Sequence, residues 1–155
     1  MNPSPPALSR ILETSLYVAD LDRAEAFYAR VFGFAAMSRD ERLRAMSVPG
    51  RGVLLLFRRG ASGEPGAPPF GTIPGHDGAG SLHLAFAIPA DSLAAWEAHL
   101  AALEIAVESR LDWPQGSISL YFRDPDGHSL EVATPGLWAN DRTMNDPVPG
   151  ATMAV

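Results

Sequence analysis

The chain has 155 residues, 46% of them hydrophobic, with 12 basic and 18 acidic residues and a net charge of −6. This length and composition predict one domain with a packed core. The acidic balance disfavours a nucleic-acid partner, because phosphate contacts need a basic surface. No apolar run approaches the roughly 20 residues of a membrane span, and the start of the chain lacks a signal-peptide pattern. We therefore expect a cytoplasmic protein with no membrane partner.

Two residue types are missing from the sequence. There is no cysteine, which excludes disulfides, thiolate nucleophiles and iron–sulfur clusters. There is no lysine either, because all 12 basic residues are arginine. The chain therefore cannot form a Schiff base through lysine or carry a lysine-linked pyridoxal phosphate.

The first part of the chain predicts a strand, a helix and three more strands. Residues 11–18 are rich in β-branched and aromatic side chains, which is typical of a strand. Apolar residues recur at helical spacing over residues 21–32, with Asp20 as the N-cap and Gly33 as the residue that ends the helix. Short strands are expected at 34–38, 42–48 and 53–58.

The later part of the chain predicts the same order of elements. Residues 60–80 are rich in glycine and proline, so we expect them to form a long loop. A strand at 82–88 is followed by a helix that Asp91 caps and that ends near Leu103. Three further strands are expected at 105–109, 117–123 and 128–133. A tight turn of Asp, Pro, Asp and Gly separates the last two.

This internal repeat predicts the fold class. We expect an α+β fold in which two βαβββ modules form a cupped, eight-stranded mixed sheet with the helices outside and a pocket inside. A single domain is expected over residues 8–133, with terminal arms at both ends of the chain. The expected parts are module one at 8–59, the loop at 60–80, module two at 81–133, and the arms at 1–7 and 134–155.

Superposing the two modules brings four positions into correspondence. Glu13 and His83 occupy matching strands, each five residues before the aliphatic residue that ends its strand. Leu55 lies roughly opposite Glu131 in the last strand of each module. If a pseudo-twofold axis relates the modules, all four positions converge on one point of the cup. Three of the four carry groups that bind metals.

Three stretches of the sequence resemble the vicinal oxygen chelate superfamily. They read YVADLDRAEAFYARVFGF, SLHLAF and YFRDPDGHSLEV. The superfamily includes glyoxalase I, fosfomycin-resistance enzymes, methylmalonyl-CoA epimerase, extradiol dioxygenases and bleomycin-resistance proteins. The resemblance implies metal ligands at Glu13, His83 and Glu131. Two positions depart from the pattern, because Glu13 stands where His or Gln is commoner and Leu55 stands where glyoxalase I has a carboxylate.

The implied ligand set indicates the chemistry. Two carboxylates and one imidazole make a site that is formally neutral with a divalent ion, and such ligands suit Mn, Fe, Ni, Zn or Mg. A buried Glu131 needs a metal, an arginine or a proton, because an unpaired buried carboxylate is costly. Open positions on the ion would bind two vicinal oxygens of a substrate, with Glu131 and Tyr121 as the catalytic side chains.

Each of these residues also has a plain structural interpretation. His83 could be a core histidine, Glu13 could pair with an arginine or water, Glu131 could face solvent, and Tyr121 could be ordinary sheet core. His128 is expected to be an exposed turn residue. His76, in the loop, is either a mobile acid or base or has no role, and His99 is expected at the surface of its helix. Trp113 either lines the pocket or simply packs.

Three functional hypotheses follow. The first is a metal-dependent enzyme of the superfamily, glyoxalase-like or dioxygenase-like, acting on a small oxygenated substrate chelated through vicinal oxygens. The second is a metal-free protein of the bleomycin-resistance type that binds a small molecule or sequesters an antibiotic. The third is a non-catalytic dimeric scaffold. A homodimer is expected because the superfamily often pairs modules across subunits and because Leu137 and Trp138 are apolar enough to pack on a partner.

Overall fold

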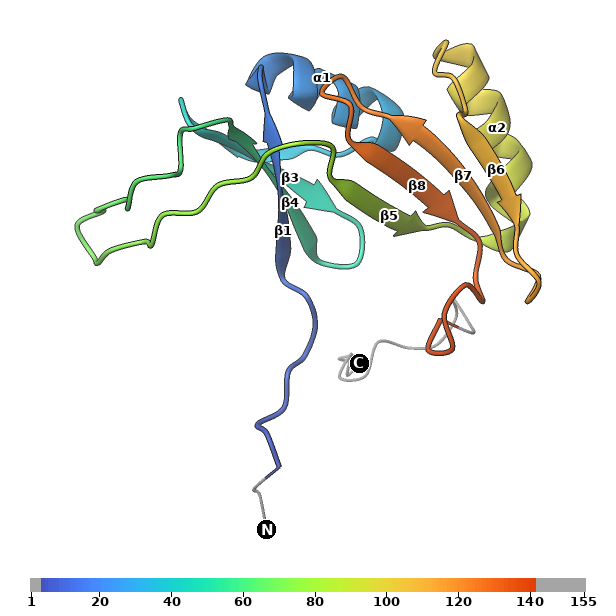
Figure 1. Cartoon of the computed structure of the whole chain (residues 1–155), viewed down its shortest axis with the longest axis horizontal. Coiled ribbons are helices and arrows are strands. Elements are labelled where there is room, and N and C mark those ends of the chain that lie inside the picture. The colour runs from blue at the N-terminus through green and yellow to red at the C-terminus, as the bar shows by residue number, and fades with distance from the viewer. Residues whose placement is uncertain (1–3, 142–155) are drawn as a thin grey trace, which may run out of the picture. The chain divides into compact units, whose positions relative to one another are not determined.

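Two compact units, divided between Gly80 and Ser81, make up the chain (Figure 1). The structure is a computed structural model that describes residues 4–141. Over these residues, each unit contains a four-stranded mixed sheet and one α-helix. The predicted α+β fold with two βαβββ modules is therefore confirmed. The extents predicted for the domain and its arms remain predictions, and residues 1–3 and 142–155 of the arms lie outside the described residues.

Unit one has the strand order β1-β4-β3-β2, with β1 parallel to β4 and the other pairs antiparallel. The predicted helix is confirmed at both ends. The Arg23 N–H donates to the Asp20 carboxylate at 3.0 Å, and Gly33 takes a left-handed φ of 69°. The elements are β1 (Glu13–Val18), α1 (Leu21–Phe32), β2 (Ala36–Arg39), β3 (Leu43–Val48) and β4 (Gly52–Arg58).

The strand register assigns the side chains of unit one to two faces of its sheet. Arg44 of β3 forms ion pairs with α1, so its neighbour in register, Leu56, lies on the face that the helix covers. Side chains alternate along a strand. The opposite face of the sheet, which α1 does not cover, therefore carries Glu13, Tyr17 and Phe57.

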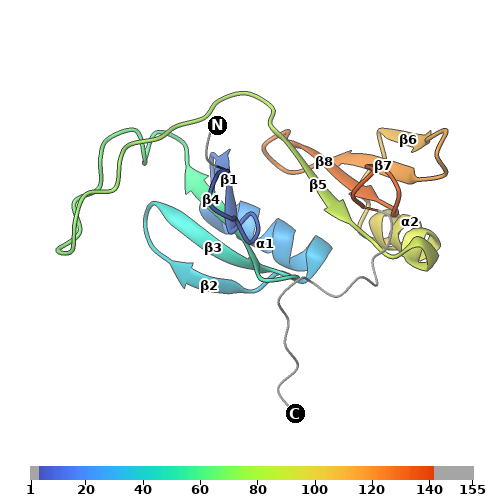
Figure 2. The same cartoon turned by 90° about the horizontal axis from the view of Figure 1, so that it is seen from below.

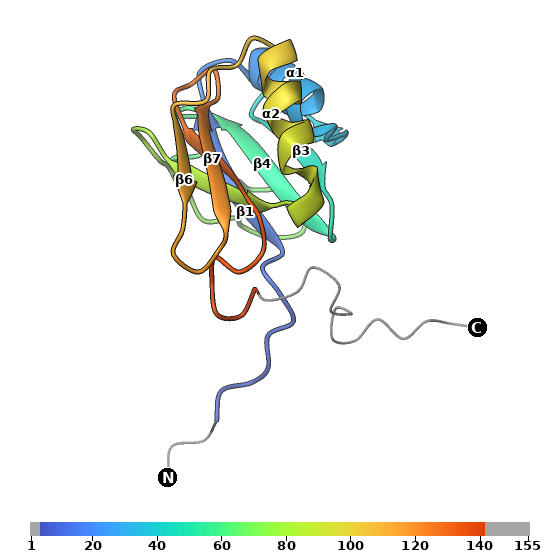
Figure 3. The ribbon, with the colours of Figure 1, turned by 90° about the vertical axis from the view of Figure 1, so that its right-hand side faces the viewer.

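Unit two repeats this arrangement, with the order β5-β8-β7-β6 and β5 parallel to β8. The helix α2 runs beside the sheet (Figure 3) and is joined to β6 by an ion pair between Glu97 and Arg110. The elements are β5 (His83–Ala87), the 3₁₀ helix η1 (Ala90–Ser92), α2 (Leu93–Ala102), β6 (Ser109–Asp112), β7 (Ile118–Arg123) and β8 (Ser129–Ala133).

Two local predictions for unit two are wrong. The strand predicted at 105–109 begins only at Ser109, because Ser109 is the first residue of β6 that pairs with β7, opposite Tyr121. Asp91 does not cap the helix. It lies in η1, so α2 begins after Ser92, whose side chain makes no capping hydrogen bond.

Register again separates two faces in the sheet of unit two. The face toward α2 carries apolar side chains that form most of this unit's core, among them Leu120, Phe122, Leu130 and Val132, all at most 1% exposed. The opposite face carries His83, Ser119, Tyr121 and Glu131. We call these two surfaces the helix face and the open face of a sheet. The polar residues predicted to do chemistry in unit two therefore share its open face.

Residues 60–80 form the long loop that their glycine and proline content predicts (Figure 2). The loop runs out and back, with a bridge between Gly66 and Ile73. A hydrogen bond of 2.8 Å from the His76 N–H to the Ser62 carbonyl joins its two arms. None of the helices within residues 4–141 has the length and apolar character needed to cross a membrane.

Candidate functional site

Two of the predicted metal ligands, His83 and Glu131, lie together on the open face of unit two. They belong to the neighbouring strands β5 and β8. Nε2 of His83 is 3.3 Å from Oε2 of Glu131. The Glu131 side chain is 4% exposed, whereas that of His83 is 52% exposed. The pair therefore joins a buried carboxylate to an imidazole that solvent can reach.

Tyr121, the predicted catalytic phenol, lies directly opposite Glu131 on β7. Its ring stacks against that of His83, with the ring centroids 6.1 Å apart. Burial raises the pKa of the Tyr121 phenol, and the charge of Glu131 and a hydrogen bond to it raise it further. Tyr121 is therefore a protonated hydrogen-bond donor at neutral pH.

Hydrogen bonds satisfy the buried carboxylate of Glu131 on one side. The Ser119 hydroxyl donates to Oε1 of Glu131 at 2.5 Å, and the Trp113 indole N–H donates to the Ser119 oxygen at 2.9 Å. No sequence motif singles out Ser119, and the sequence predicts Trp113 only as a wall or packing residue. Both side chains support Glu131 instead.

The other nitrogen of the His83 ring fixes its protonation pattern. Nδ1 lies 3.1 Å from the carbonyl oxygen of Ser129. A carbonyl can only accept a hydrogen bond, so Nδ1 carries a proton. In the neutral ring, Nε2 then presents a lone pair to Oε2 of Glu131. A metal ion beside these two electron-rich atoms would be attracted to both.

This pair of donors fits a divalent metal ion. Histidine nitrogen and carboxylate oxygen are common ligands, and a ligating histidine usually donates its other ring N–H to a carbonyl or a carboxylate. Within residues 4–141, however, no three His, Asp or Glu side chains gather into a complete metal-binding cluster. The fit therefore rests on two donors, both in unit two.

Glu13, the third predicted ligand, belongs to unit one. It is the exposed first residue of β1 and lies on the open face of its sheet. Val53 of β4 is the register partner of Glu13. Leu55, two positions further along β4, lies on the same face. The part that Glu13 plays in metal binding therefore stays a prediction.

His128 is not the exposed turn residue that the sequence predicted, because its side chain is 0% exposed. The Leu82 N–H donates to Nδ1 of His128 at 3.1 Å, and the His128 N–H donates to the Asp124 carboxylate at 2.8 Å. The same carboxylate oxygen accepts the Asp126 N–H at 2.9 Å. The Asp-Pro-Asp-Gly-His motif therefore builds a turn that joins the start of β5 to β8.

The two remaining histidines lie elsewhere. His76 packs its ring edge against Phe57 and lies beside Tyr17, all within unit one. His99 is an exposed residue of α2, as predicted, with its ring against Trp96. Neither lies in the hydrogen-bonded group around Glu131.

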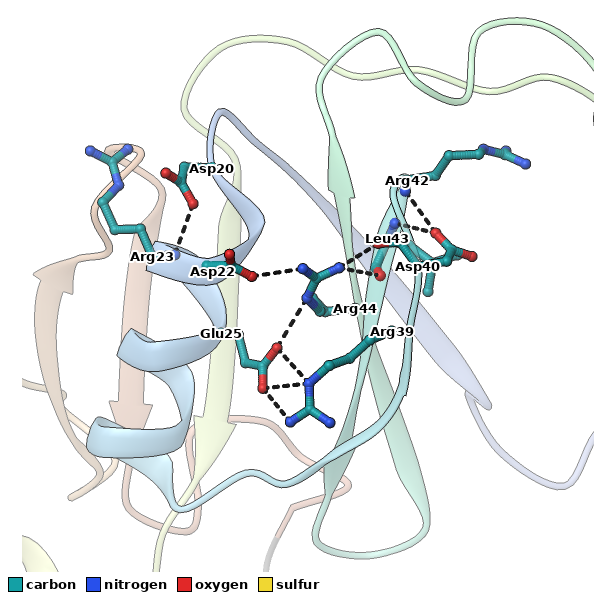
Figure 4. A network of polar contacts seen from close by, with 9 residues as sticks. All are labelled: Asp20, Asp22, Arg23, Glu25, Arg39, Asp40, Arg42, Leu43 and Arg44. Atoms are coloured by element: carbon teal, nitrogen blue, oxygen red, sulfur yellow. Dashed lines mark hydrogen bonds and ion pairs between the residues drawn. The ribbon is translucent and has the colours of Figure 1, made fainter.

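A separate network of charged side chains joins α1 to β2 and β3 (Figure 4). Arg44 contacts Asp22 at 2.7 Å and Glu25 at 3.0 Å, and Arg39 forms a two-point contact with Glu25. A pocket of about 340 Å³ lies beside this network, lined by Ala19, Asp20, Leu21, Asp22, Asp40, Glu41, Arg44 and Arg58. Because its arginines and acids pair with one another, we assign the network to holding the helix on the sheet.

Comparisons with known proteins agree with this fold. The sequence profile of the Glyoxalase/Bleomycin resistance protein/Dioxygenase superfamily matches residues 10–132. A search of the curated proteins gave no match.

Solved structures provide the remaining comparisons. A lactoylglutathione lyase from Agrobacterium tumefaciens is 40% identical, with a TM-score of 0.78 over 88% of this chain and 99% of that one. An integron cassette protein from the mobile metagenome of V. cholerae is 27% identical, with a TM-score of 0.66 over 86% and 100% of the two chains. A genomically encoded fosfomycin resistance protein from Listeria monocytogenes is 18% identical, with a TM-score of 0.61 over 90% and 100%, and shares the fold alone.

Proposed function

Because this chain belongs to the Glyoxalase/Bleomycin resistance protein/Dioxygenase superfamily, we propose that it is a metal-dependent lyase or isomerase. Its substrate is a small oxygenated molecule that binds through two neighbouring oxygens. The observation that carries the proposal is the contact of 3.3 Å between Nε2 of His83 and Oε2 of Glu131. Both donors sit on strands of one sheet, which holds them in place.

The metal ligands in this proposal are His83, Glu131 and, from unit one, Glu13. A divalent ion bound there would act as a Lewis acid that stabilises negative charge developing on the substrate oxygens. Two carboxylates and one imidazole leave the site formally neutral. The dioxygenase alternative is less favoured, because the ligand set that activates dioxygen usually has two histidines and one carboxylate.

The other side chains of the open face bind and orient the substrate. Tyr121 keeps its proton at neutral pH and, when substrate binds, would turn that proton from Glu131 to a substrate oxygen. Oε2 of Glu131 is the carboxylate oxygen that Ser119 does not occupy, and it would be the carboxylate atom that binds the metal ion. His83 stacks on Tyr121 and limits the directions in which its phenol can point.

Lactoylglutathione is the first substrate to test. The relative from Agrobacterium tumefaciens that is 40% identical over nearly its whole length is named a lactoylglutathione lyase. The lactoyl group carries a hydroxyl and a carbonyl on adjacent carbons, which is the pair of vicinal oxygens that the proposed site requires. Leu55 departs from the pattern of glyoxalase I, which has a carboxylate at the matching position.

Metal content tests the proposal. After growth with Mn, Fe, Ni or Zn, we expect about one metal ion per chain in the wild type and in His99→Ala, the control at an exposed histidine. His83→Ala should lose the metal, because it removes the one nitrogen donor of the set. The wild type should form or cleave lactoylglutathione only when loaded with metal.

A metal-free binding protein of the bleomycin-resistance type is the second candidate. It is favoured by Leu55, which offers no donor, and by the lack of a three-ligand cluster within residues 4–141. Negligible metal in the wild type, in His83→Ala and in His99→Ala alike would reject the enzyme and select this candidate.

We also propose that the protein is a homodimer. Trp138 is 70% exposed, and Leu8 and Ile11, ahead of β1, are 96% and 84% exposed. Packing these side chains against a second copy would remove their apolar surface from water. Light scattering should give twice the chain mass of 16.5 kDa, and a monomer at micromolar concentration would reject the dimer.

A further inference from the structure

We propose that Trp113 and Ser119 are positioning residues that hold the Glu131 carboxylate in the orientation its metal requires. This inference rests on the proposed function, because it assigns a role toward the same metal. It concerns residues that neither the sequence motifs nor the ligand set includes. The structural basis is a chain of hydrogen bonds that runs from Trp113 through Ser119 to Glu131.

The chemistry of the three groups fixes the direction of every bond in this chain. An indole N–H can only donate, so the Ser119 oxygen must accept from Trp113. The single hydroxyl proton of Ser119 is then left for Oε1 of Glu131, 2.5 Å away. Oε1 therefore accepts the hydrogen bond that Ser119 donates. Trp113 thus acts on Glu131 only through Ser119.

This chain of bonds distinguishes the two oxygens of Glu131. Oε1 accepts from Ser119, whereas Oε2 faces Nε2 of His83. On the far side of the His83 ring, the carbonyl of Ser129 holds Nδ1. A hydrogen bond therefore holds each donor at its other polar atom, Oε1 of Glu131 and Nδ1 of His83. Each side chain then presents its remaining atom, Oε2 or Nε2, to the same point.

The surroundings make this arrangement rigid. Ser119 is 0% exposed and Glu131 is 3% exposed, so solvent does not compete for their hydrogen bonds. Trp113 is fixed by its backbone, which accepts the Gly116 N–H at 2.9 Å and donates to the Ser117 carbonyl at 2.8 Å. The tight turn before β7 therefore holds the backbone from which the indole reaches Ser119.

Affinity for zinc ions, measured by competition with a chromophoric chelator, tests the inference on the full-length protein. Ser119→Ala should weaken zinc binding about 10- to 100-fold, the usual effect of losing a group that supports a ligand. Ser119→Thr keeps a hydroxyl and should restore most of the affinity. Ser109→Ala, an exposed serine on the same open face, is the matched control and should bind zinc like the wild type.

The double mutant tests whether Trp113 acts on zinc binding through Ser119, which we call a relay, or whether the two residues act independently. Trp113→Phe alone should weaken zinc binding, because it removes the indole N–H and keeps an aromatic ring. In the Ser119→Ala background the same change should add nothing, since the path to Glu131 is already broken. The absorption spectrum of the cobalt-loaded protein should shift in Ser119→Ala and not in Ser109→Ala.

The outcomes that overturn the inference are distinct from those that overturn the proposed function. Zinc binding by Ser119→Ala equal to the wild type, or additive effects of the two substitutions, would reject the relay and leave the metal site standing. A wild-type protein that binds no zinc, cobalt, manganese or nickel would reject both. Thermal unfolding of each metal-free variant shows whether a loss of affinity comes from a loss of fold.

Discussion

The hydroxyl oxygen of Tyr17 lies 2.7 Å from Nδ1 of His76, although 59 residues separate them in the sequence. Tyr17 belongs to β1 and His76 to the loop at residues 60–80. The loop approaches so closely at Gly78 that a Cβ atom there would lie 2.4 Å from the Tyr17 ring. These contacts hold the loop against the open face of unit one, which also carries Glu13 and Leu55.

Replacing Gly78 with alanine should release the loop from β1. The added methyl group would collide with the Tyr17 ring, so either the ring or the loop must move. Tyr17→Phe should have a milder effect, about 1 kcal/mol, because it removes one partly buried hydrogen bond. Faster amide exchange at His76, measured by hydrogen–deuterium exchange, is the expected result for both variants.

Gly63→Ala is the control for this experiment, because a Cβ atom at Gly63 would meet nothing within 4 Å. It changes the same loop by the same methyl group. Exchange that is equally fast in Gly63→Ala and Gly78→Ala would contradict the contact between the loop and Tyr17.

The charged network of α1 predicts a loss of stability in acid. Hydrogen bonds from Arg39 lower the pKa of Glu25, and the charges of Arg39 and Arg44 lower it further against the opposing effect of partial burial. A carboxyl group whose pKa is lowered in the folded state stabilises the fold at pH values above its usual pKa. The stabilisation is lost as the pH falls through the folded pKa.

Glu25→Gln should therefore lower the free energy of unfolding at neutral pH by about 1 kcal/mol. The difference from the wild type should shrink as the pH falls below the ordinary glutamate pKa and disappear below the lowered pKa of the folded state, where both side chains are neutral. Urea unfolding over a series of pH values measures it. Glu64→Gln, in the exposed loop, should match the wild type throughout, and a constant difference for Glu25→Gln at every pH would contradict the prediction.

The buried histidine of the turn before β8 predicts a large structural effect. His128→Ala should cost roughly 2 to 4 kcal/mol, since it empties a fully buried site and leaves the Leu82 N–H without its acceptor. His128→Asn should cost less, because an amide oxygen can accept that N–H. Thermal unfolding compares both with His99→Ala, which should change stability by less than about 0.5 kcal/mol. Equal melting temperatures for His128→Ala and His99→Ala would show that the turn does not depend on His128.

Where the sequence predicted well, the information was local. Asp20 and Gly33 mark the ends of α1 because a capping carboxylate and a left-handed glycine act within one turn of the helix. The alternation of side chains along a strand, with a period of two residues, is also local. It accounts for Tyr121 and Glu131 sharing one face of the sheet. The resemblance singled out His83 and Glu131, which lie 3.3 Å apart in the structure, while their role as metal ligands stays a prediction.

Where the sequence predicted poorly, the answer depends on residues far along the chain. The start of β6 is set by pairing with β7, not by the β-branched residues Ile105 and Val107 that precede the strand. The burial of His128 depends on Leu82, 46 residues away. Ser119 carried no signal at all, since a serine in an apolar strand becomes informative only when Trp113 and Glu131 are seen beside it.

The last prediction concerns Glu13, the predicted ligand that lies in unit one. If Glu13 binds the metal together with His83 and Glu131, Glu13→Ala should weaken zinc binding about 10-fold or more, since it removes one of three donors and one negative charge. Glu13→His should keep the metal and raise the formal charge of the site to +1. The higher charge should strengthen binding of an anionic substrate that chelates the ion.

Thr14→Ala is the matched control for Glu13, because Thr14 is the next residue of β1, is also exposed, and points to the helix face of the sheet. Chelator competition with zinc measures all the variants under one set of conditions. Wild-type affinity in Glu13→Ala would show that the protein part of the site is the pair His83 and Glu131 alone. With only two protein donors, more coordination positions of the ion would be filled by water and substrate. That outcome would also predict weaker metal binding than a three-ligand site.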